Sequence, residues 1–172
     1  MNSVSNKTKI NYPYIMYMTD FEDDKTSYYL RNIFTRDNVL EKLKIITNSH
    51  IIGSTHVRPC TLDSKKHRTH MMPNALTILC TDVSYQLPDY ILDGMMVECS
   101  VICLTSEDFD DKRHPCIIYV DRNDTESISK YVKMFVDLTP DAINYKKMCL
   151  ETASKINATY KASWLLDEID NA

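Results

Sequence analysis

The stretch from Tyr145 to Ile169 constrains the fold most, because it carries the only tryptophan of the chain, Trp164, in an apolar run close to the C-terminus. A chain end this apolar must pack against the rest of the protein, since termini fray unless something holds them. A lone tryptophan in such a run is typical of a core position. We therefore expect three large side chains of this stretch in the core: Trp164, Leu166 and Leu150.

Two structures fit this stretch. Leu150 and Ile156 flank a polar connector, residues 157–159, and two apolar segments at that separation can pair as a hairpin. The same apolar residues also fit the stripe of one helix over 141–161. We favour a helix over 140–148 that is followed by a terminal hairpin.

The length of 172 residues fits one domain, which buries roughly 70% of its unfolded surface and needs no disulfide or metal to fold. Residues 1–11 are polar, so we expect a flexible N-terminal segment before a single domain over 12–172. Hydrophobic content of 44% and charged content of 26% are ordinary for a globular protein.

Glycine is unusually scarce, with only Gly53 and Gly94 in the chain. Phosphate loops, nucleophile elbows and dinucleotide fingerprints need several closely spaced glycines, because the backbone must approach a ligand or turn with positive φ. The sequence therefore argues against these three kinds of site.

The net charge of -4 argues against a protein that binds nucleic acid through overall positive charge. The sequence has no apolar run near the roughly 20 residues of a membrane span, and its first residues lack the apolar core of a signal peptide. We expect synthesis in the cytosol or nucleus, and so expect the six cysteines to be reduced.

The apolar patterns predict a mixed chain. Residues 12–18 and 27–34 are expected to form a first β-hairpin, and the stripe within 35–48 predicts a helix. Further strands are expected over 75–83, 95–103 and 116–120, and a second helix over 125–138. These elements predict an α+β fold, with an antiparallel sheet packed by two or three helices.

No catalytic, cofactor or metal site is expected. Cys99 and Cys103 are four residues apart in a predicted strand, which separates them by about 13 Å and keeps them from sharing one zinc ion. His67 and His70 have workable spacing but lack partner ligands. The carboxylates fall in runs that are typical of solvated loops, so we do not expect an enzyme.

The segment 56–70 is the most basic part of the chain and is followed by two methionines. One interpretation is an exposed loop. The other is a patch for the phosphates of lipid or nucleic acid, with methionines that enter the interface. Its candidate membrane-binding or nucleocapsid-binding residues are Arg58, Lys65, Lys66, Arg68, Met71 and Met72.

The order of these pieces resembles the matrix proteins of rhabdoviruses, and the closest type is that of plant cytorhabdoviruses. The likeness is strongest over Tyr145–Leu150 and Ala162–Ile169, which include a W-x-L-D-x-I pattern, and is weaker over Leu87–Ile102. The chain lacks the lysine-rich N-terminal arm and the proline-rich budding motif of that family.

The resemblance implies a structural protein that self-associates, condenses the viral nucleoprotein–RNA and bridges it to the anionic inner leaflet of the envelope during budding. It implies residence in the virion and in the host cytoplasm on membranes, or in the nucleus, with the viral glycoprotein tail and host factors as further partners. Self-association by an open head-to-tail contact would use the segment with Tyr12, Pro13 and Tyr14.

Two other functions are considered. A small viral protein that binds one host factor without catalysis would be a monomer or a closed dimer. An RNA-binding regulator is disfavoured by the net charge of -4.

Overall fold

The computed structural model describes residues 13–18, 32, 40–47, 57–59 and 72–170, and within these it leaves out the side chains of 57–59 and 160–170. The described strands form a six-stranded sheet, and neighbouring strands pair in parallel throughout. The strands are β1 (Tyr14–Met18), β2 (Lys44–Thr47), β3 (Val57–Pro59), β4 (Ile78–Thr81), β5 (Val101–Thr105) and β6 (Ile118–Asp121).

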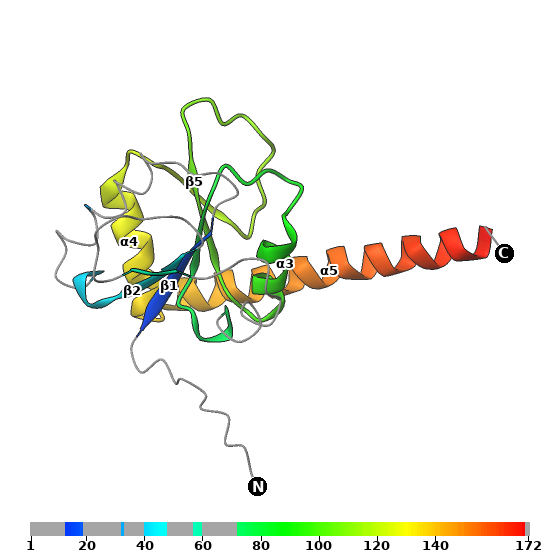
Figure 1. Ribbon diagram of the computed structural model, residues 1–172, viewed down its shortest axis with the longest axis horizontal. Helices are drawn as coiled ribbons and strands as arrows, with labels where there is room; N and C mark the ends of the chain where they lie inside the picture. The colour runs from blue at the N-terminus through cyan, green and yellow to red at the C-terminus, as the bar shows by residue number, and fades with distance from the viewer. Residues whose placement is uncertain (1–12, 19–31, 33–39, 48–56, 60–71, 171–172) are drawn as a thin grey trace, which may run out of the picture.

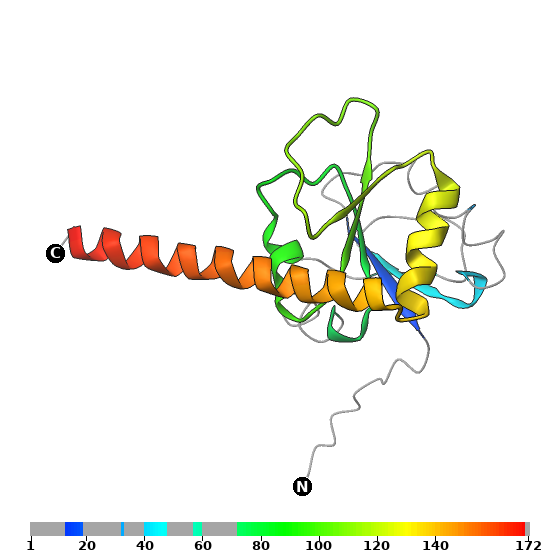
Figure 2. The ribbon, with the colours of Figure 1, turned by 180° about the vertical axis from the view of Figure 1, so that it is seen from behind.

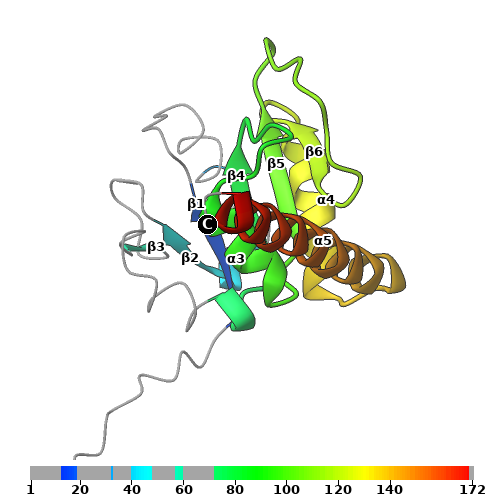
Figure 3. The same ribbon diagram turned by 90° about the vertical axis from the view of Figure 1, so that its right-hand side faces the viewer.

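The strand order across the sheet is β3-β2-β1-β4-β5-β6, as Figure 3 shows. The chain enters at the centre in β1, continues outward through β2 to β3, and then returns to place β4 on the free side of β1. Met16 of β1 consequently pairs with Ile46 of β2 on one side and with Ile78 of β4 on the other. The direction of winding therefore reverses between β1 and β4.

The predicted α+β fold with an antiparallel sheet is wrong: the protein has an α/β fold with a parallel sheet. All five residues of β1 are buried, and so are all five of β5. Strands that are buried on both faces read as continuous apolar runs, which is typical of a parallel sheet covered by helices on both sides.

One face of the sheet is covered by α4 (Thr125–Val136). Asp124 caps this helix, since its Oδ1 accepts a hydrogen bond from the backbone N–H of Ser127 at 3.0 Å. Ile128, Val132 and Phe135 recur at helical spacing and are buried against this face.

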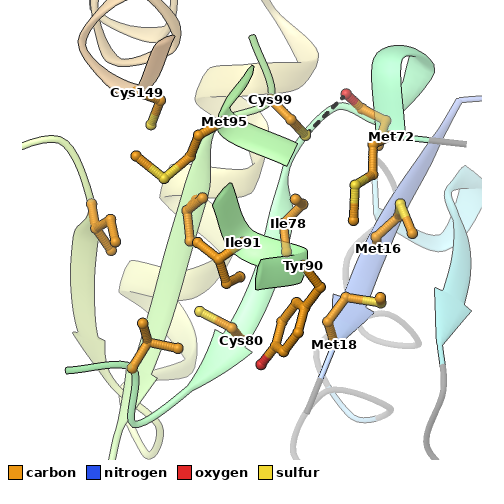
Figure 4. Close-up of a cluster of buried hydrophobic side chains, with 14 of the residues drawn as sticks. Met16, Met18, Met72, Ile78, Cys80, Tyr90, Ile91, Met95, Cys99 and Cys149 are labelled. Atoms are coloured by element: carbon orange, nitrogen blue, oxygen red, sulfur yellow. Dashed lines mark hydrogen bonds between the residues drawn. The ribbon is translucent and has the colours of Figure 1, made fainter. Parts of the chain in front are cut away.

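The opposite face is covered by α3 (Asp89–Met96) and by the short 3₁₀ turn η2 (Met72–Asn74). Figure 4 shows Tyr90 and Ile91 of α3 close to Ile78 of β4, with Met16 and Met18 of β1 beside them. The loop of residues 106–117 joins β5 to β6 without a helix, and its last residues, Cys116 and Ile117, pack into the same cluster.

The last described element is α5 (Pro140–Asp170), which packs mainly against α3 and more lightly against α4. Among the described side chains of α5, those of residues 140–159, the fully buried ones are Ala142, Cys149 and Ala153. The C-terminal part of this helix extends away from the sheet and the other helices (Figures 1 and 2). None of the described helices combines the length and the hydropathy needed to cross a membrane.

The predicted terminal hairpin is wrong, because α5 is one continuous helix from 140 to 170. The alternative of one long helix over 141–161 is confirmed.

The predicted helix over 35–48 is wrong for its described part, where a 3₁₀ turn, η1 (Leu40–Lys42), leads into β2. The predicted strand over 95–103 is wrong at its start, since α3 runs to Met96, and right at its end, where β5 begins at Val101.

Several other predicted elements are confirmed. The segments 12–18 and 75–83 contain β1 and β4, the segment 116–120 covers all of β6 except its last residue, and the helix predicted over 125–138 is α4. In contrast, the predicted strand over 27–34 lies outside the described residues, except for position 32.

Candidate functional site

The candidate site is the edge of the sheet at which the parallel strands end. In open α/β sheets, ligands bind beyond the carboxyl ends of the strands, at the point where the winding direction reverses. That point lies between β1 and β4 here. Three described loops follow strands at this edge: 82–88 after β4, 106–117 after β5 and 122–124 after β6.

Asp82 holds the first two of these loops together. Its backbone is in the left-handed region with φ 46°, and its Oδ1 accepts a hydrogen bond from the backbone N–H of Ser106 at 2.7 Å. Its own N–H donates to the carbonyl of Leu104 at 3.1 Å. The carboxylate therefore fixes the chain as it leaves both β4 and β5.

A stacked pair of rings joins the same two loops farther out. The rings of Tyr85 and His114 are parallel within 1°, with centroids 4.3 Å apart. The His114 ring is buried, and its Nε2 lies 2.7 Å from the carbonyl oxygen of Tyr85, which makes this nitrogen the protonated one. Tyr85 remains 50% exposed, although one face of its ring is covered by His114.

A second group of rings lies beside the first. Phe109 stacks on Tyr119 of β6 with centroids 5.8 Å apart. The Tyr119 hydroxyl donates to the carbonyl of Val83 at 3.3 Å and accepts from the N–H of His114 at 3.1 Å. Burial raises the pKa of Tyr119 to about 12, so the hydroxyl keeps its proton at neutral pH.

Two cations are positioned over these rings. The Lys112 ammonium lies 4.4 Å from the ring centroid of Tyr85, and the Arg113 guanidinium lies 5.2 Å from that of Tyr119. Both side chains are exposed, and the rings hold them by cation–π attraction. The loop 106–117 thus presents two ordered positive charges.

The same loop carries four exposed carboxylates: Glu107, Asp108, Asp110 and Asp111. Beyond β6, Asp121 accepts a hydrogen bond from the N–H of Asn123 at 2.7 Å, and Asp124 caps α4. Hydrogen bonds from Ser127 lower the pKa of Asp124, so this cap stays ionised. Among the described residues, no group of three or more His, Cys, Asp or Glu side chains could hold a metal ion.

Of the sequence-predicted membrane or nucleocapsid residues, the structure describes two, Arg58 and Met72. Arg58 lies in β3, opposite Ile46, and Lys65, Lys66, Arg68 and Met71 are outside the described residues. Met72 is 1% exposed and belongs to the core on the α3 side. The Met72 side chain is therefore part of the protein core and not of an exposed surface.

Of the residues predicted for self-association, Tyr12 is outside the described residues, Pro13 is exposed and Tyr14 is buried in β1. Leu150 is half-buried on α5. Trp164 and Leu166 belong to the same helix, in the part whose side chains are not described.

The fold is similar to those of several solved structures. A protein described as a UDP-N-acetylglucosamine 2-epimerase from Listeria monocytogenes matches with a TM-score of 0.54 and 11% identity, over 89% of this chain and 45% of its own. The calicheamicin glycosyltransferase CalG4 matches with a TM-score of 0.56 and 7% identity, over 90% and 43%. The GtfA/B complex matches with a TM-score of 0.54 and 12% identity, over 96% and 38%.

At identities this low, the TM-scores show a shared fold alone. The chain spans less than half the length of each of these structures. No protein-family model and no curated sequence matches it.

The resemblance to rhabdovirus matrix proteins is therefore wrong. Its strongest segment, Tyr145–Leu150 and Ala162–Ile169, lies within the single helix α5, and its weaker segment, Leu87–Ile102, spans α3 and the start of β5. The protein instead has an α/β fold with a parallel sheet, and solved structures of other proteins have a similar fold.

The residues at the candidate site were not singled out by the sequence. Tyr85, His114 and Tyr119 come from three separate segments, and only the fold brings their rings together. The sequence contains one signal for this site: the basic tripeptide Lys112-Arg113-His114 directly follows the acidic residues of 107–111, in the segment after a predicted strand.

Proposed function

We propose that the chain is a nucleotide-binding domain that holds a nucleoside diphosphate sugar at the carboxyl edge of its sheet. The observation that carries this proposal is the strand order, whose winding reverses between β1 and β4. Loops diverge at such a reversal and leave a crevice in which a ligand can reach backbone N–H groups and loop side chains.

The class of nucleotide follows from two observations. Dinucleotide sites of this architecture use a glycine-rich turn after the first strand, and the whole chain has two glycines, neither of which follows β1 directly. The structural neighbours include a protein named for UDP-N-acetylglucosamine and a glycosyltransferase, and they share the strand arrangement. A sugar nucleotide is thus favoured over a dinucleotide.

The described loops offer contacts for both parts of such a ligand. Lys112 and Arg113 can neutralise the diphosphate, because the rings beneath them already order their charges. His114 and Lys112 cover the two faces of the Tyr85 ring, and its exposed edge can contact the base or the sugar. The four exposed carboxylates of the same loop repel a ligand that consists of phosphates alone. They can accept hydrogen bonds from hydroxyl groups, which favours a ligand that also carries a sugar.

Titration calorimetry on the full chain tests this proposal. UDP-N-acetylglucosamine, UDP-glucose and GDP-mannose are compared with NADH, and we expect at least one sugar nucleotide to bind while NADH does not. The double variant Lys112→Ala with Arg113→Ala should weaken that binding about tenfold or more, because each charge-assisted contact contributes roughly 1.5–3 kcal/mol. Lys147→Ala, an exposed lysine on α5, is the matched control and should bind as the unchanged protein does.

Absence of binding for all three sugar nucleotides at millimolar concentration would refute the proposal. If the double variant binds as tightly as the unchanged protein, the nucleotide site does not include the loop 106–117. The functions predicted from the matrix-protein resemblance stay predictions, and the resemblance that motivated them is wrong.

A further inference from the structure

Two buried thiols from distant parts of the chain meet on the α3 side of the sheet. Cys116 ends the loop 106–117, and Cys149 lies near the middle of α5. The Sγ of Cys149 donates to the carbonyl oxygen of Cys116 at 3.4 Å, so the two cysteines lie against each other. Both cysteines are reduced and at most 1% exposed.

The surroundings give the two thiols unequal roles. The hydrogen bond from the Cys149 thiol is the main cause that lowers the pKa of Cys116 to about 7, and Thr152 of α5 adds a second hydrogen bond. The pKa of Cys149 is raised by the same hydrogen bond and by burial. The shared proton therefore stays on Cys149, and Cys116 is the nucleophile of the pair.

We propose that Cys116 and Cys149 are a redox modification site, at which a small peroxide converts the two thiols into a reversible disulfide. The Cys149 thiol contacts the carbonyl and interacts with the thiol of Cys116. The two sulfurs are therefore within reach of a disulfide bond. Hydrogen peroxide is the suitable oxidant, because it is not much larger than water and can enter a packed site through local opening.

The chemistry balances with this oxidant alone. The Cys116 thiolate attacks one peroxide oxygen, the O–O bond breaks, and the leaving hydroxide takes a proton to form water, so that a sulfenic acid remains on Cys116. The sulfur of Cys149 then attacks the sulfur of Cys116, the S–O bond breaks, and the departing hydroxide takes the Cys149 proton as a second water. Each sulfur loses one electron, and the peroxide gains two.

The disulfide would fasten α5 to the loop 106–117. The same end of that loop is already held by the stack of His114 on Tyr85 and by the hydrogen bond from the N–H of His114 to Tyr119. Oxidation would therefore add a covalent link to α5 beside these contacts and stabilise the packing of α5. This inference does not depend on the proposed nucleotide site.

The test uses the reduced full chain, treated with a small excess of hydrogen peroxide and then digested with trypsin without reductant. Cys116 falls in the peptide 114–122 and Cys149 in the peptide 148–155, whereas Cys80, Cys99 and Cys103 share the peptide 69–112. We expect the first two peptides to be linked, with a mass about 2 Da below their sum. Dithiothreitol should separate them, and the oxidised protein should unfold at a temperature several degrees higher.

Variants separate a specific pair from general oxidation. Cys149→Ser should leave a sulfenic acid on Cys116 that dimedone traps, and Cys103→Ser should form the same linked peptides as the unchanged protein. Circular dichroism checks that each variant is folded. Unlinked peptides in the treated wild-type protein, or a link from either one to 69–112, would overturn the proposal.

Discussion

At the scale of single residues, Gly94 determines how closely α3 approaches the sheet. A Cβ atom at this position would overlap the Cδ1 of Ile78 in β4, with the Sδ of Met72 at 3.6 Å on another side. Ile78 and Met72 are themselves almost fully buried, so neither has free space to move into. The absence of a side chain is what allows the helix and the strand to pack at this distance.

We therefore expect Gly94→Ala to destabilise the protein by about 1–3 kcal/mol, although alanine favours a helix more than glycine does. Urea denaturation measures this change. Met96→Ala, at a position of the same helix that is 40% exposed, should alter the free energy of unfolding by less than about 0.5 kcal/mol. A Gly94→Ala protein as stable as the wild type would show that α3 can move away from β4 at little cost.

Part of the residue-scale picture could not be predicted from the sequence. Met72 was assigned to an interface because it follows a basic segment, yet its neighbours in space are Gly94 and the core around β4. Tyr14 was assigned to self-association because it lies near a polar end, yet it is buried in a central strand. Burial depends on what the rest of the chain places nearby, and local sequence does not contain that.

At the scale of elements, the end of α4 shows a local conflict between sequence and conformation. The N–H of Thr139 donates to the carbonyl of Met134 at 3.3 Å, so that the helix ends in a Schellman motif. The residue that must then adopt a left-handed backbone is Leu138, with φ 47°. Its side chain is 54% exposed and contributes little packing.

Leu138→Gly should consequently stabilise the protein by about 1 kcal/mol, because glycine adopts this conformation without the steric penalty of a Cβ atom. Thermal unfolding checks the prediction. Leu138→Ala retains the Cβ atom and should give no comparable gain. If Leu138→Gly lowers the free energy of unfolding, the packing of the leucine side chain contributes more to stability than its left-handed backbone costs.

Elements were predicted well where one pattern dominated. The helix α4 has a capping aspartate and a regular apolar stripe, and the prediction places it correctly. In contrast, β2 is only four residues long, Lys44–Thr47, and its apolar residues also fit the helical spacing of Leu40, Leu43 and Ile46. In short segments of a parallel sheet, periodicity cannot distinguish a doubly buried strand from a helix.

At the scale of the whole molecule, buried acidic groups make stability depend on pH. Burial raises the pKa of the Cys99 thiol from 9.0 to about 12 and that of the Tyr14 hydroxyl from 10.0 to about 12. Folding keeps both groups neutral, so their contribution is complete below pH 9 and is lost as the pH rises toward 12. The Cys116 thiol has the opposite effect. Its pKa is lowered to about 7, so its contribution to the free energy of unfolding grows as the pH rises from about 7 to 9.

The free energy of unfolding should therefore fall above pH 9, by up to about 1.4 kcal/mol per pH unit for each raised group. Guanidinium titrations from pH 8 to 11 measure this slope. Cys99→Ser can keep the hydrogen bond to the carbonyl of Ala75 while removing the thiol, and should reduce the slope just above pH 9. A free energy that stays constant over this range would contradict the assignment.

The topology was the largest failure of sequence reasoning, for a physical reason. Strand order and direction follow from contacts between residues far apart in the chain, such as the pairing of Met16 with both Ile46 and Ile78. An antiparallel hairpin was assumed because consecutive strands most simply pair that way. The candidate site depends on this topology, since parallel strands bring all their carboxyl ends to one edge.

Hydrogen–deuterium exchange of the full chain with and without UDP-N-acetylglucosamine tests whether a sugar nucleotide binds at the carboxyl edge of the sheet. We expect slower exchange in the loops 82–88 and 106–117, which follow β4 and β5, and unchanged exchange in α5. Protection confined to α5, or identical exchange with and without saturating nucleotide, would contradict it.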